Sequence, residues 1–497
     1  MYPSMPAAEL RRAFAVEIHP GRFRPEAHFY PRAREATIHR TVAAFLEADP
    51  AALRRRYLER HPEVAPHELD AVWRYAPRHL RWAGGDLFAA RTAEGRREMV
   101  LIETNSCPSG MKSMPALDRA HPDAGYRRVV EHLLLPPGAN TDGEFAILYD
   151  KNFAEVSGYA HALADVLGRP VHLVPVPDEE TDHVWFDGGR LLFRTESRGV
   201  LHATAALRYV TQRPWNRFPV RTETTIVNPI VACLAGGRNK LAAAKAYDLY
   251  NEAARGSGLR IRTPETVCDV PKREVPDLVE QFGGSAVVKV PYANAGQGVF
   301  TITSPFELEH FMAADTRYAK FVVQALLGGT TWPPNSRNAT YRHTGMRPDA
   351  NGHRFVADLR MGVVATDAGF IPSAIYARKA ARPLDVMPSD GSPSWDILGT
   401  NLSIAQADGG WAAETERLVL ASETEFDDLD LDGDDLLDAF VQTILAVIAI
   451  DRMAGGMLLP DGELDREALK RANDDDVFLD ELATGALRGG GQGRAGR

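Results

Sequence analysis

Two strand-like segments joined by a short polar turn constrain the fold of this chain more than any other feature. An apolar run at 99–102 leads into a Glu-Thr-Asn sequence that begins at Glu103 and ends at Asn105, and an earlier strand carries Asp86. The segment 91–97 between them is short, polar and glycine-containing, which is typical of a hairpin turn. Because strand side chains alternate between faces, Glu103 and Asn105 leave the same face. If the hairpin forms, Asp86 converges with them.

These three side chains offer hard oxygen ligands. Such a cluster suits Mg²⁺, with Mn²⁺ as a substitute, held partly by protein and partly by phosphate oxygens. The apolar strand places Glu103 at the edge of a packed layer, where a charge without a partner is unfavourable and a metal-bound charge is stable. The alternative is an ordinary hairpin whose acidic residues face water. We predict a metal site of Asp86, Glu103 and Asn105.

A second feature is a β-branched run that contains Lys289, followed by a loop with Gly296 and Gly298 and then another strand-like segment. Glycines let the backbone approach a ligand and point N–H groups at an anion such as phosphate. The loop lacks the Gly-Lys-Ser/Thr of a Walker loop and the helix start of a dinucleotide fingerprint. A bland turn is the alternative for the loop alone, but the lysine and the metal cluster together favour a nucleotide site.

The two features together resemble the ATP-grasp superfamily. The Val-Val-Lys-x-Pro run that ends at Pro291 is similar to that family's nucleotide-binding hairpin, and Glu-x-Asn at 103–105, followed by Pro-Ser-Gly, is similar to its metal motif. In ordinary members the metal strands follow the lysine strand, whereas here they precede it. This order is similar to the circularly permuted branch, and permutation is tolerated where chain ends lie close together. The resemblance covers roughly residues 80–410.

The resemblance implies an α/β (α+β) fold, with a circularly permuted ATP-grasp core, an additional α/β domain of the pre-ATP-grasp type and N-terminal helices. We expect N-terminal helices plus the metal-binding strands at 1–140 and the additional α/β domain at 141–235. That domain is expected to open with a strand at 145–149, a helix near 159–167 and a return strand at 171–175. The nucleotide-binding subdomain is expected at 236–330, the central sheet with C-terminal helices at 331–480, and a flexible tail at 481–497.

The resemblance also implies roles for single residues. Lys240 and Lys289 are expected to bind the α- and β-phosphates of ATP, and the alternative for Lys240 is a solvated helix lysine. The family often has an acidic residue near the position of Gln324 to hold the ribose, and this chain departs from that pattern. The whole nucleotide-binding set is Lys240, Lys289, Asn294, Gly296, Gln297, Gly298, Gln324 and Leu326.

Three residues are expected to act in catalysis, namely Arg360, Arg378 and Asn401. The arginines offer planar donor forks that suit a carboxylate or a transferring phosphoryl group. Asn401 lies in a loop similar to the asparagine loop that closes the family's site. Period-two spacing puts Asp358 and Arg360 on one strand face, and the alternative for that pair is a surface salt bridge.

The reaction that the resemblance implies is ATP-dependent, ADP-forming ligation of a small-molecule carboxylate to an amine, on amino-acid or small-peptide-like substrates, through an acyl phosphate. Water must be kept from that intermediate, and the loop at 294–298 is the candidate lid. The alternatives are a phosphotransferase on the same fold and a nucleotide-binding scaffold without catalysis. Phosphoryl transfer depends mainly on cations and positioning, which agrees with the residue types found.

Composition agrees with this interpretation. The chain has 497 residues, of which 44% are hydrophobic and 25% charged, and its net charge of -10 argues against nucleic-acid binding. Three distant cysteines suggest a reducing compartment, and we expect a cytoplasmic protein with a possible homodimer. The N-terminus lacks an apolar signal core, and the longest apolar stretch, 439–450, is too short to span a bilayer, so no membrane partner is expected.

One acidic motif does not indicate a calcium site. The segment 428–433 matches the first half of an EF-hand loop, but Ala439 stands where a bidentate Glu is needed. Its carboxylates are expected instead to favour the N-terminus of a helix at 436–453.

Overall fold

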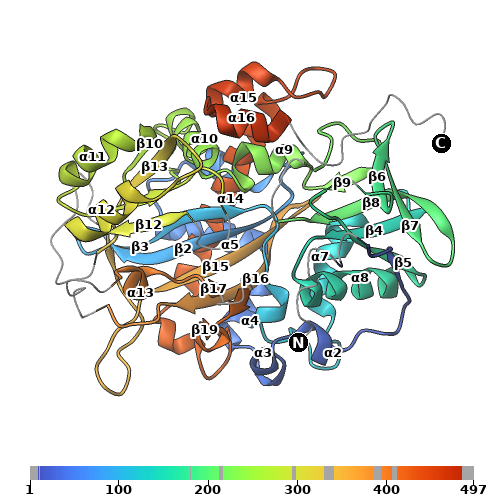
Figure 1. Cartoon of the computed structure of the whole chain (residues 1–497). Helices are drawn as coiled ribbons and strands as arrows, with labels where there is room; N and C mark the ends of the chain where they lie inside the picture. Colours follow the sequence, from blue (N-terminus) through green and yellow to red (C-terminus); the bar gives the residue numbers. More distant parts are fainter. Residues whose placement is uncertain are drawn as a thin grey trace.

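The computed structural model of the chain describes residue 9 and residues 12–179, 181–211, 217–293, 298–328, 341–384, 393–405 and 411–483. Three sheets of four or more strands, with helices packed on them, make up these residues (Figure 1). The prediction of a mixed α/β fold is confirmed. Most of the predicted tail at 481–497 lies outside the described residues.

The central sheet holds six strands, which pair antiparallel. The hairpin that the sequence predicts is present, because β3 pairs with β2 along nearly its whole length. Leu87, Met99 and Leu101 of this hairpin are fully buried, which is the apolar packing that fixes its register. In spatial order the strands are β14 (Arg342–His343), β2 (Trp82–Arg91), β15 (Ala357–Thr366), β16 (Gly369–Lys379) and β19 (Leu418–Val419), with β3 (Arg97–Asn105) on β2.

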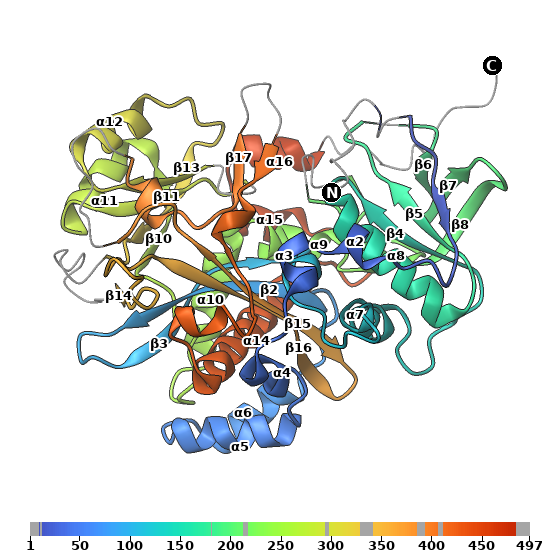
Figure 2. The same ribbon diagram turned by 90° about the horizontal axis from the view of Figure 1, so that it is seen from below.

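Helix α14 (Gly433–Gly456) packs against β2, β3 and β15 of this sheet. It begins with a capping box: the Asp432 side chain accepts from the backbone N–H of Asp435 at 3.0 Å, and the Asp435 carboxylate accepts from the N–H of Asp432 at 3.0 Å. The acidic segment therefore starts a helix, as the sequence predicts. Three short helices contact α14 and extend this layer (Figure 2), namely α4 (Arg40–Leu46), α5 (Pro50–Arg60) and α6 (Pro66–Trp73).

A smaller antiparallel sheet carries Lys289 at the end of its strand β11. This sheet and its helices form a lobe at one edge of the central sheet (Figure 1). Its strands, in spatial order, are β10 (Thr266–Pro271), β13 (Lys320–Ala325), β11 (Ala286–Lys289) and β12 (Val299–Ile302). Its helices are α10 (Lys240–Ala253), α11 (Val275–Gln281) and α12 (Pro305–Ala313).

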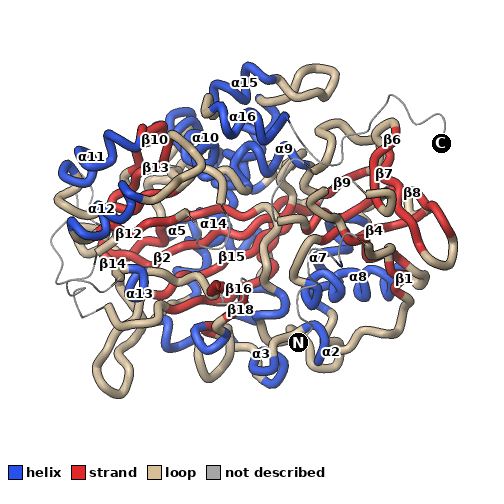
Figure 3. Tube along the Cα trace, viewed as in Figure 1, coloured by secondary structure: helices blue, strands red, loops and turns tan. Residues whose placement is uncertain are grey.

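The third sheet has seven strands and lies at the other end of the molecule (Figure 3). Its middle strand β4 (Glu144–Tyr149) runs parallel to both of its neighbours, β5 (Val171–Pro175) and β8 (Gly199–Tyr209). The other strands are β1 (Val16–Ile18) on β5, β7 (Arg190–Thr195) and β6 (Val184–Asp187) beyond β8, and β9 (Thr225–Val227) on β8. Strand β1, from within the predicted segment 1–140, thus belongs to this sheet.

Helix α8 (Phe153–Leu167) connects β4 to β5, which is the strand–helix–strand unit that the sequence predicts. The helix begins six residues earlier than the predicted start at Tyr159. Gly158 lowers the intrinsic helix propensity there. In the fold it is required, because a Cβ at Gly158 would lie 2.5 Å from the ring of Tyr126 on helix α7 (Ala124–Leu134). Tertiary packing overrides the local preference.

The remaining elements are short. They comprise α2 (Pro25–His28), α3 (Pro31–Glu35), η1 (Met111–Ser113), α9 (Ile230–Ala232), η2 (Cys233–Gly237), η3 (Lys272–Glu274), α13 (Trp395–Leu398), β17 (Ser403–Ala405), β18 (Trp411–Ala413), η4 (Thr415–Arg417), η5 (Phe426–Leu429), α15 (Arg466–Ala472) and α16 (Asp476–Ala483). Among the helices of the described ranges, none has both the length and the apolar character needed to cross a bilayer.

Candidate functional site

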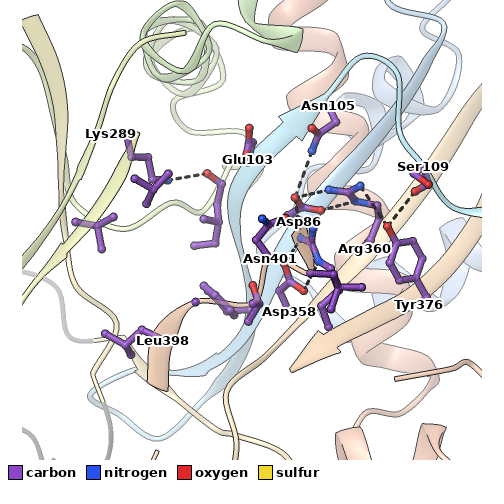
Figure 4. A pocket seen from close by; sticks show the side chains of 18 of the residues that line it. Asp86, Glu103, Asn105, Ser109, Lys289, Asp358, Arg360, Tyr376, Leu398 and Asn401 are labelled. Carbon is purple, nitrogen blue, oxygen red and sulfur yellow. Dashed lines mark hydrogen bonds and ion pairs between the residues drawn. The ribbon is translucent and has the colours of Figure 1, made fainter. Parts of the chain in front are cut away.

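A cavity of about 290 Å³ opens between the three sheets. Side chains from the β2–β3 hairpin, from the small sheet, from β15 and β16, and from the loops that follow β4 and β8 all line it. Figure 4 shows Lys289 and Leu398 toward one end of the cavity and Tyr376 and Ser109 toward the other, with Asp86 between them. The fold therefore brings segments together that lie some hundreds of residues apart in the sequence.

The hairpin register places the predicted metal residues side by side. Asp86 is directly opposite Glu103, and Gly84 is opposite Asn105, with a bulge after Asp86. The Asn105 amide Nδ2 donates to Asp86 Oδ2 at 3.3 Å. All three predicted metal residues line the cavity.

Two arginines bind the carboxylate of Asp86. Arg360 donates to it in a fork, Nε to Oδ1 at 2.6 Å and Nη2 to Oδ2 at 2.7 Å, and Arg378 Nη2 lies 3.0 Å from Oδ2. Burial alone would raise the pKa of this carboxyl, but Arg360 and Arg378 hold the pKa at about 2. Asp86 is thus an ionised counter-ion, and a metal ion that it helped to hold would have to displace an arginine.

Three neighbouring strands set up this arrangement. Across β2, β15 and β16 the register aligns Asp86, Arg360 and Tyr376 in one row. In the next row Asp358 lies opposite Arg378 and accepts its Nε at 3.0 Å. Asp358 is 3% exposed and Arg360 8%, so the alternative of a surface salt bridge is wrong. Both arginines are held in buried ion pairs, where losing one partner is strongly destabilising.

Glu103 and Asn105 fit a magnesium ion better than Asp86 does. Glu103 Oε1 lies 3.2 Å from Lys240 Nζ, and the Asn105 Oδ1 accepts from Arg238 Nη1 at 3.3 Å. Both are oxygen donors of the class that magnesium takes. Within the described residues, no group of three or more His, Cys, Asp or Glu side chains is arranged to hold a metal by itself. A cation here would need ligand oxygens from a phosphate as well.

The two predicted phosphate lysines flank Glu103. Lys289 Nζ donates to the carbonyl of Ile102 at 3.1 Å, and burial lowers the pKa of Lys289 to about 8. Lys240, at the start of α10, donates to the carbonyl of Ala293 at 2.9 Å. Its side chain is 9% exposed, so the alternative of a solvated helix lysine is wrong. Burial is the largest influence on the pKa of Glu103 and raises it, but Lys240 and Lys289 together outweigh burial, so that the pKa is lowered.

An apolar slot lies beside Lys289. It is lined by Phe88, Val287, Leu326 and Leu398, which is a surface suited to a planar base. The Gln324 side chain lines the cavity but donates to Thr266 Oγ1 at 2.8 Å, a bond that ties it to strand β10. Asn401 also lines the cavity.

Of the predicted loop, Gly298 alone is described; Asn294, Gly296 and Gln297 lie outside the described residues, as does the greater part of the candidate lid. Gly298 has a φ of +67°, and its carbonyl accepts from the N–H of Val290 at 2.8 Å. A Cβ at this position would lie 2.2 Å from Val290 Cγ2, so glycine is required.

Several residues that line the cavity were not predicted from the sequence. Arg238 immediately precedes the Asn-Lys pair that starts α10, and Lys151 follows the apolar strand β4. That position, at the carboxyl end of a parallel strand, is a signal that could have found Lys151. Lys112 and Tyr376 carried no comparable signal. Cys107 is buried and burial raises its pKa, which agrees with a packing residue and not with a nucleophile.

No model of a known protein family matches the sequence, and no curated protein matches it. Solved structures do resemble it. A glutathione synthetase-like effector from Globodera pallida is 9% identical, with 68% of this chain and 81% of that chain covered and a TM-score of 0.38. A RimK-domain ATP-grasp protein from Sphaerobacter thermophilus is 14% identical, with coverage of 51% and 97% and a TM-score of 0.27. D-alanyl-alanine synthetase A from Vibrio cholerae is 10% identical, with coverage of 48% and 89% and a TM-score of 0.29.

ATP-grasp proteins are thus among the structural neighbours of this chain, as the sequence predicts. Circular permutation and the limits of the five predicted segments stay predictions.

Proposed function

We propose that this chain is an ATP-dependent ligase that joins a carboxylic acid to an amine and releases ADP and phosphate. One observation carries the proposal: a single cavity contains the apolar slot and Lys289 of the small sheet together with the arginine–aspartate rows of the central sheet. The first half suits a nucleoside triphosphate, and the second suits an acid and the phosphoryl group that it receives.

The position of each residue in the cavity suggests its role. The slot between Phe88 and Leu398 would take the base, and Lys289 would neutralise phosphates. Lys240 does not line this cavity but a small adjoining pocket that shares Glu103 and Lys289 with it, and from there it would add a second positive charge. Glu103 and Asn105 would hold magnesium, which draws charge from the phosphates when it is bound. Asp86 would keep Arg360 and Arg378 oriented toward the cavity without contacting the metal. This assignment differs from the sequence-based one for Asp86 alone.

The reaction then runs in two steps. A carboxylate oxygen attacks the γ-phosphorus, so that a new P–O bond forms and the bond to ADP breaks. The amine nitrogen attacks the acyl carbon, the C–N bond forms, the C–O bond to phosphate breaks, and the amine loses a proton. Arg360 and Arg378 would stabilise the negative charge that gathers on the transferring group and on the acyl oxygen.

A screen for ADP release tests the proposal. Pools of amino acids and small peptides are supplied as acids and as amines, together and apart, with ATP and Mg²⁺. The ligase account predicts ADP release that needs both an acid and an amine. Release with a single hydroxyl compound would indicate a phosphotransferase instead. Failure of ATP to bind in a calorimetric titration would refute the nucleotide site altogether.

A further inference from the structure

A group of lysines lies on the wall of the cavity that the seven-stranded sheet provides. Lys151 and Asn152 lie two and three residues after the end of β4, Thr211 lies two residues after the end of β8, and all three line the cavity. The chain leaves β4 through α8 toward β5 on one side, while β8 lies on the other side and is reached through β6 and β7. The carboxyl end of β4 is therefore a topological switch point, where open parallel sheets bind ligands.

Lys112 is fixed in place on this wall. Its Nζ donates to Asn152 Oδ1 at 3.1 Å and lies 5.2 Å from the ring centre of Tyr30. The Asn152 amide in turn donates to the Tyr209 hydroxyl at 3.2 Å. Asn152 adopts a left-handed conformation with φ 58°, which turns its side chain off the end of β4. The ammonium group of Lys112 is thus held by residues of the switch point.

The loop that carries Lys112 is anchored by a buried carboxylate. Glu155, fully buried in the first turn of α8, accepts from the backbone N–H groups of Gly110 and Met111 at 3.0 Å each, and of Lys112 at 3.2 Å. Three backbone donors on one carboxylate fix the loop backbone. Lys112 is therefore presented to the cavity by a rigid support.

No carboxylate of the described residues lies within ion-pair distance of Lys151. Among the described residues it makes no hydrogen bond or ion pair, and burial lowers its pKa to about 8. The adjacent Asp150 is committed elsewhere: it accepts from the N–H of Thr211 at 2.8 Å and pairs with Arg217 at 2.6 Å. A half-buried ammonium group without a partner is unfavourable unless a ligand supplies the charge.

The lining of the cavity carries more positive than negative charge. Six cationic side chains and three carboxylates line it. Toward the nucleotide end, Glu103 faces the lysines, and Asp86 and Asp358 pair with the two arginines. The three cationic side chains that remain are Lys112, Lys151 and Arg238, so the excess of positive charge falls on the wall of Lys112 and Lys151 and on Arg238 near it. Ser109, on the same loop as Lys112, lies at the end of the cavity away from Lys289 (Figure 4), so this excess is not placed for the triphosphate.

We propose that Lys112 and Lys151 form an anion subsite that holds a second acidic group, a carboxylate or a phosphate, of the acid substrate. The identity of that substrate rests on the proposed function, but the subsite itself does not. The acid would place one carboxylate at Arg360 and its second anion at the switch point. Tyr376 links the two places, because it accepts from Arg360 Nη1 at 3.2 Å and donates to the carbonyl of Ser109 at 3.0 Å.

Calorimetric titration of the nucleotide-free, full-length protein tests the subsite. The probes are glutarate and its neutral-ended monoamide, and phosphoserine and serine. A charge-assisted contact at the subsite predicts that glutarate binds about tenfold or more tightly than its monoamide, or that phosphoserine does so relative to serine. Lys151→Met should abolish that preference and Lys151→Arg should keep most of it. Lys245→Met is the matched control, because Lys245 lies on α10 and pairs with Asp269 outside the cavity.

The outcomes separate the possibilities. A preference for glutarate assigns a dicarboxylic substrate, and a preference for phosphoserine assigns a phosphorylated one. Lack of any preference in the wild-type protein, or a preference that survives Lys151→Met, overturns the subsite. Because the readout is binding without ATP, an absence of ligase turnover would refute the proposed function and leave this test unaffected.

Discussion

The replacement Asp86→Asn removes the negative charge that two buried arginines share. The pKa of the Asp86 carboxyl falls from its ordinary 3.8 to about 2, because the attraction of Arg360 and Arg378 exceeds the effect of burial. That difference corresponds to about 2 kcal/mol of folding free energy at neutral pH. Breaking a buried ion pair usually costs about 3–5 kcal/mol, so we expect a loss of about 2–4 kcal/mol.

Thermal unfolding of the variant measures this loss. For a domain of 150–250 residues a loss of about 2–4 kcal/mol lowers Tm by roughly 5–15 °C. The matched control is Asp358→Asn, because within the described part of the chain Asp358 forms an ion pair only with Arg378, and burial raises its pKa. We expect its Tm to fall less than that of Asp86→Asn. The stability that Asp86 contributes is present above pH 4 and is lost as the pH falls toward 2, since its folded pKa is the lower one. A Tm of Asp86→Asn within 1–2 °C of the wild type would refute the counter-ion role.

Three further expectations concern the cavity. Glu103→Gln should abolish Mg²⁺-dependent ADP release while circular dichroism shows that the fold is retained; full turnover would contradict the metal assignment. Lys289→Ala should raise the Kd of ATP about tenfold or more, whereas Lys245→Ala should not, and equal affinities would place the phosphates elsewhere. Lys151→Met should raise Tm at pH 7, because the folded pKa of Lys151 is lowered and its charge opposes folding until the pH passes the unfolded value. The charged groups near this lysine are Asp150, Arg238 and Lys112. A fall in the Tm of Lys151→Met would contradict the conclusion that the Lys151 ammonium group is not paired in the folded protein.

The sequence predicted the strands of the site well because strand period and turn chemistry are local properties. The pairing of Glu103 with Asp86 follows from a polar turn between two apolar runs, and the start of α10 follows from the Asn-Lys pair that ends at Lys240. The start of a helix directly after the acidic segment 428–433 was predictable for the same reason, although Asp432 was not singled out as its cap. Each of these features depends on residues within about one hairpin or one helical turn.

The partners of Asp86 could not be predicted in this way. Arg360 lies 274 residues away, and the contact depends on β15 pairing with β2 in one register out of many. A carboxylate beside Glu-x-Asn therefore suggested a metal ligand, whereas the register gives it two arginines. Lys112 was missed because Glu155, from a different part of the chain, fixes its loop.

Transfer of ¹⁸O tests the central claim most directly. The acid that supports ADP release is labelled with ¹⁸O in its carboxylate, the reaction is run with the amine, and the phosphate is analysed by mass spectrometry. Our account predicts one ¹⁸O atom in each phosphate, because the carboxylate oxygen attacks phosphorus and leaves with it. Unlabelled phosphate, or label that stays wholly in the product, would contradict an acyl phosphate formed in this cavity.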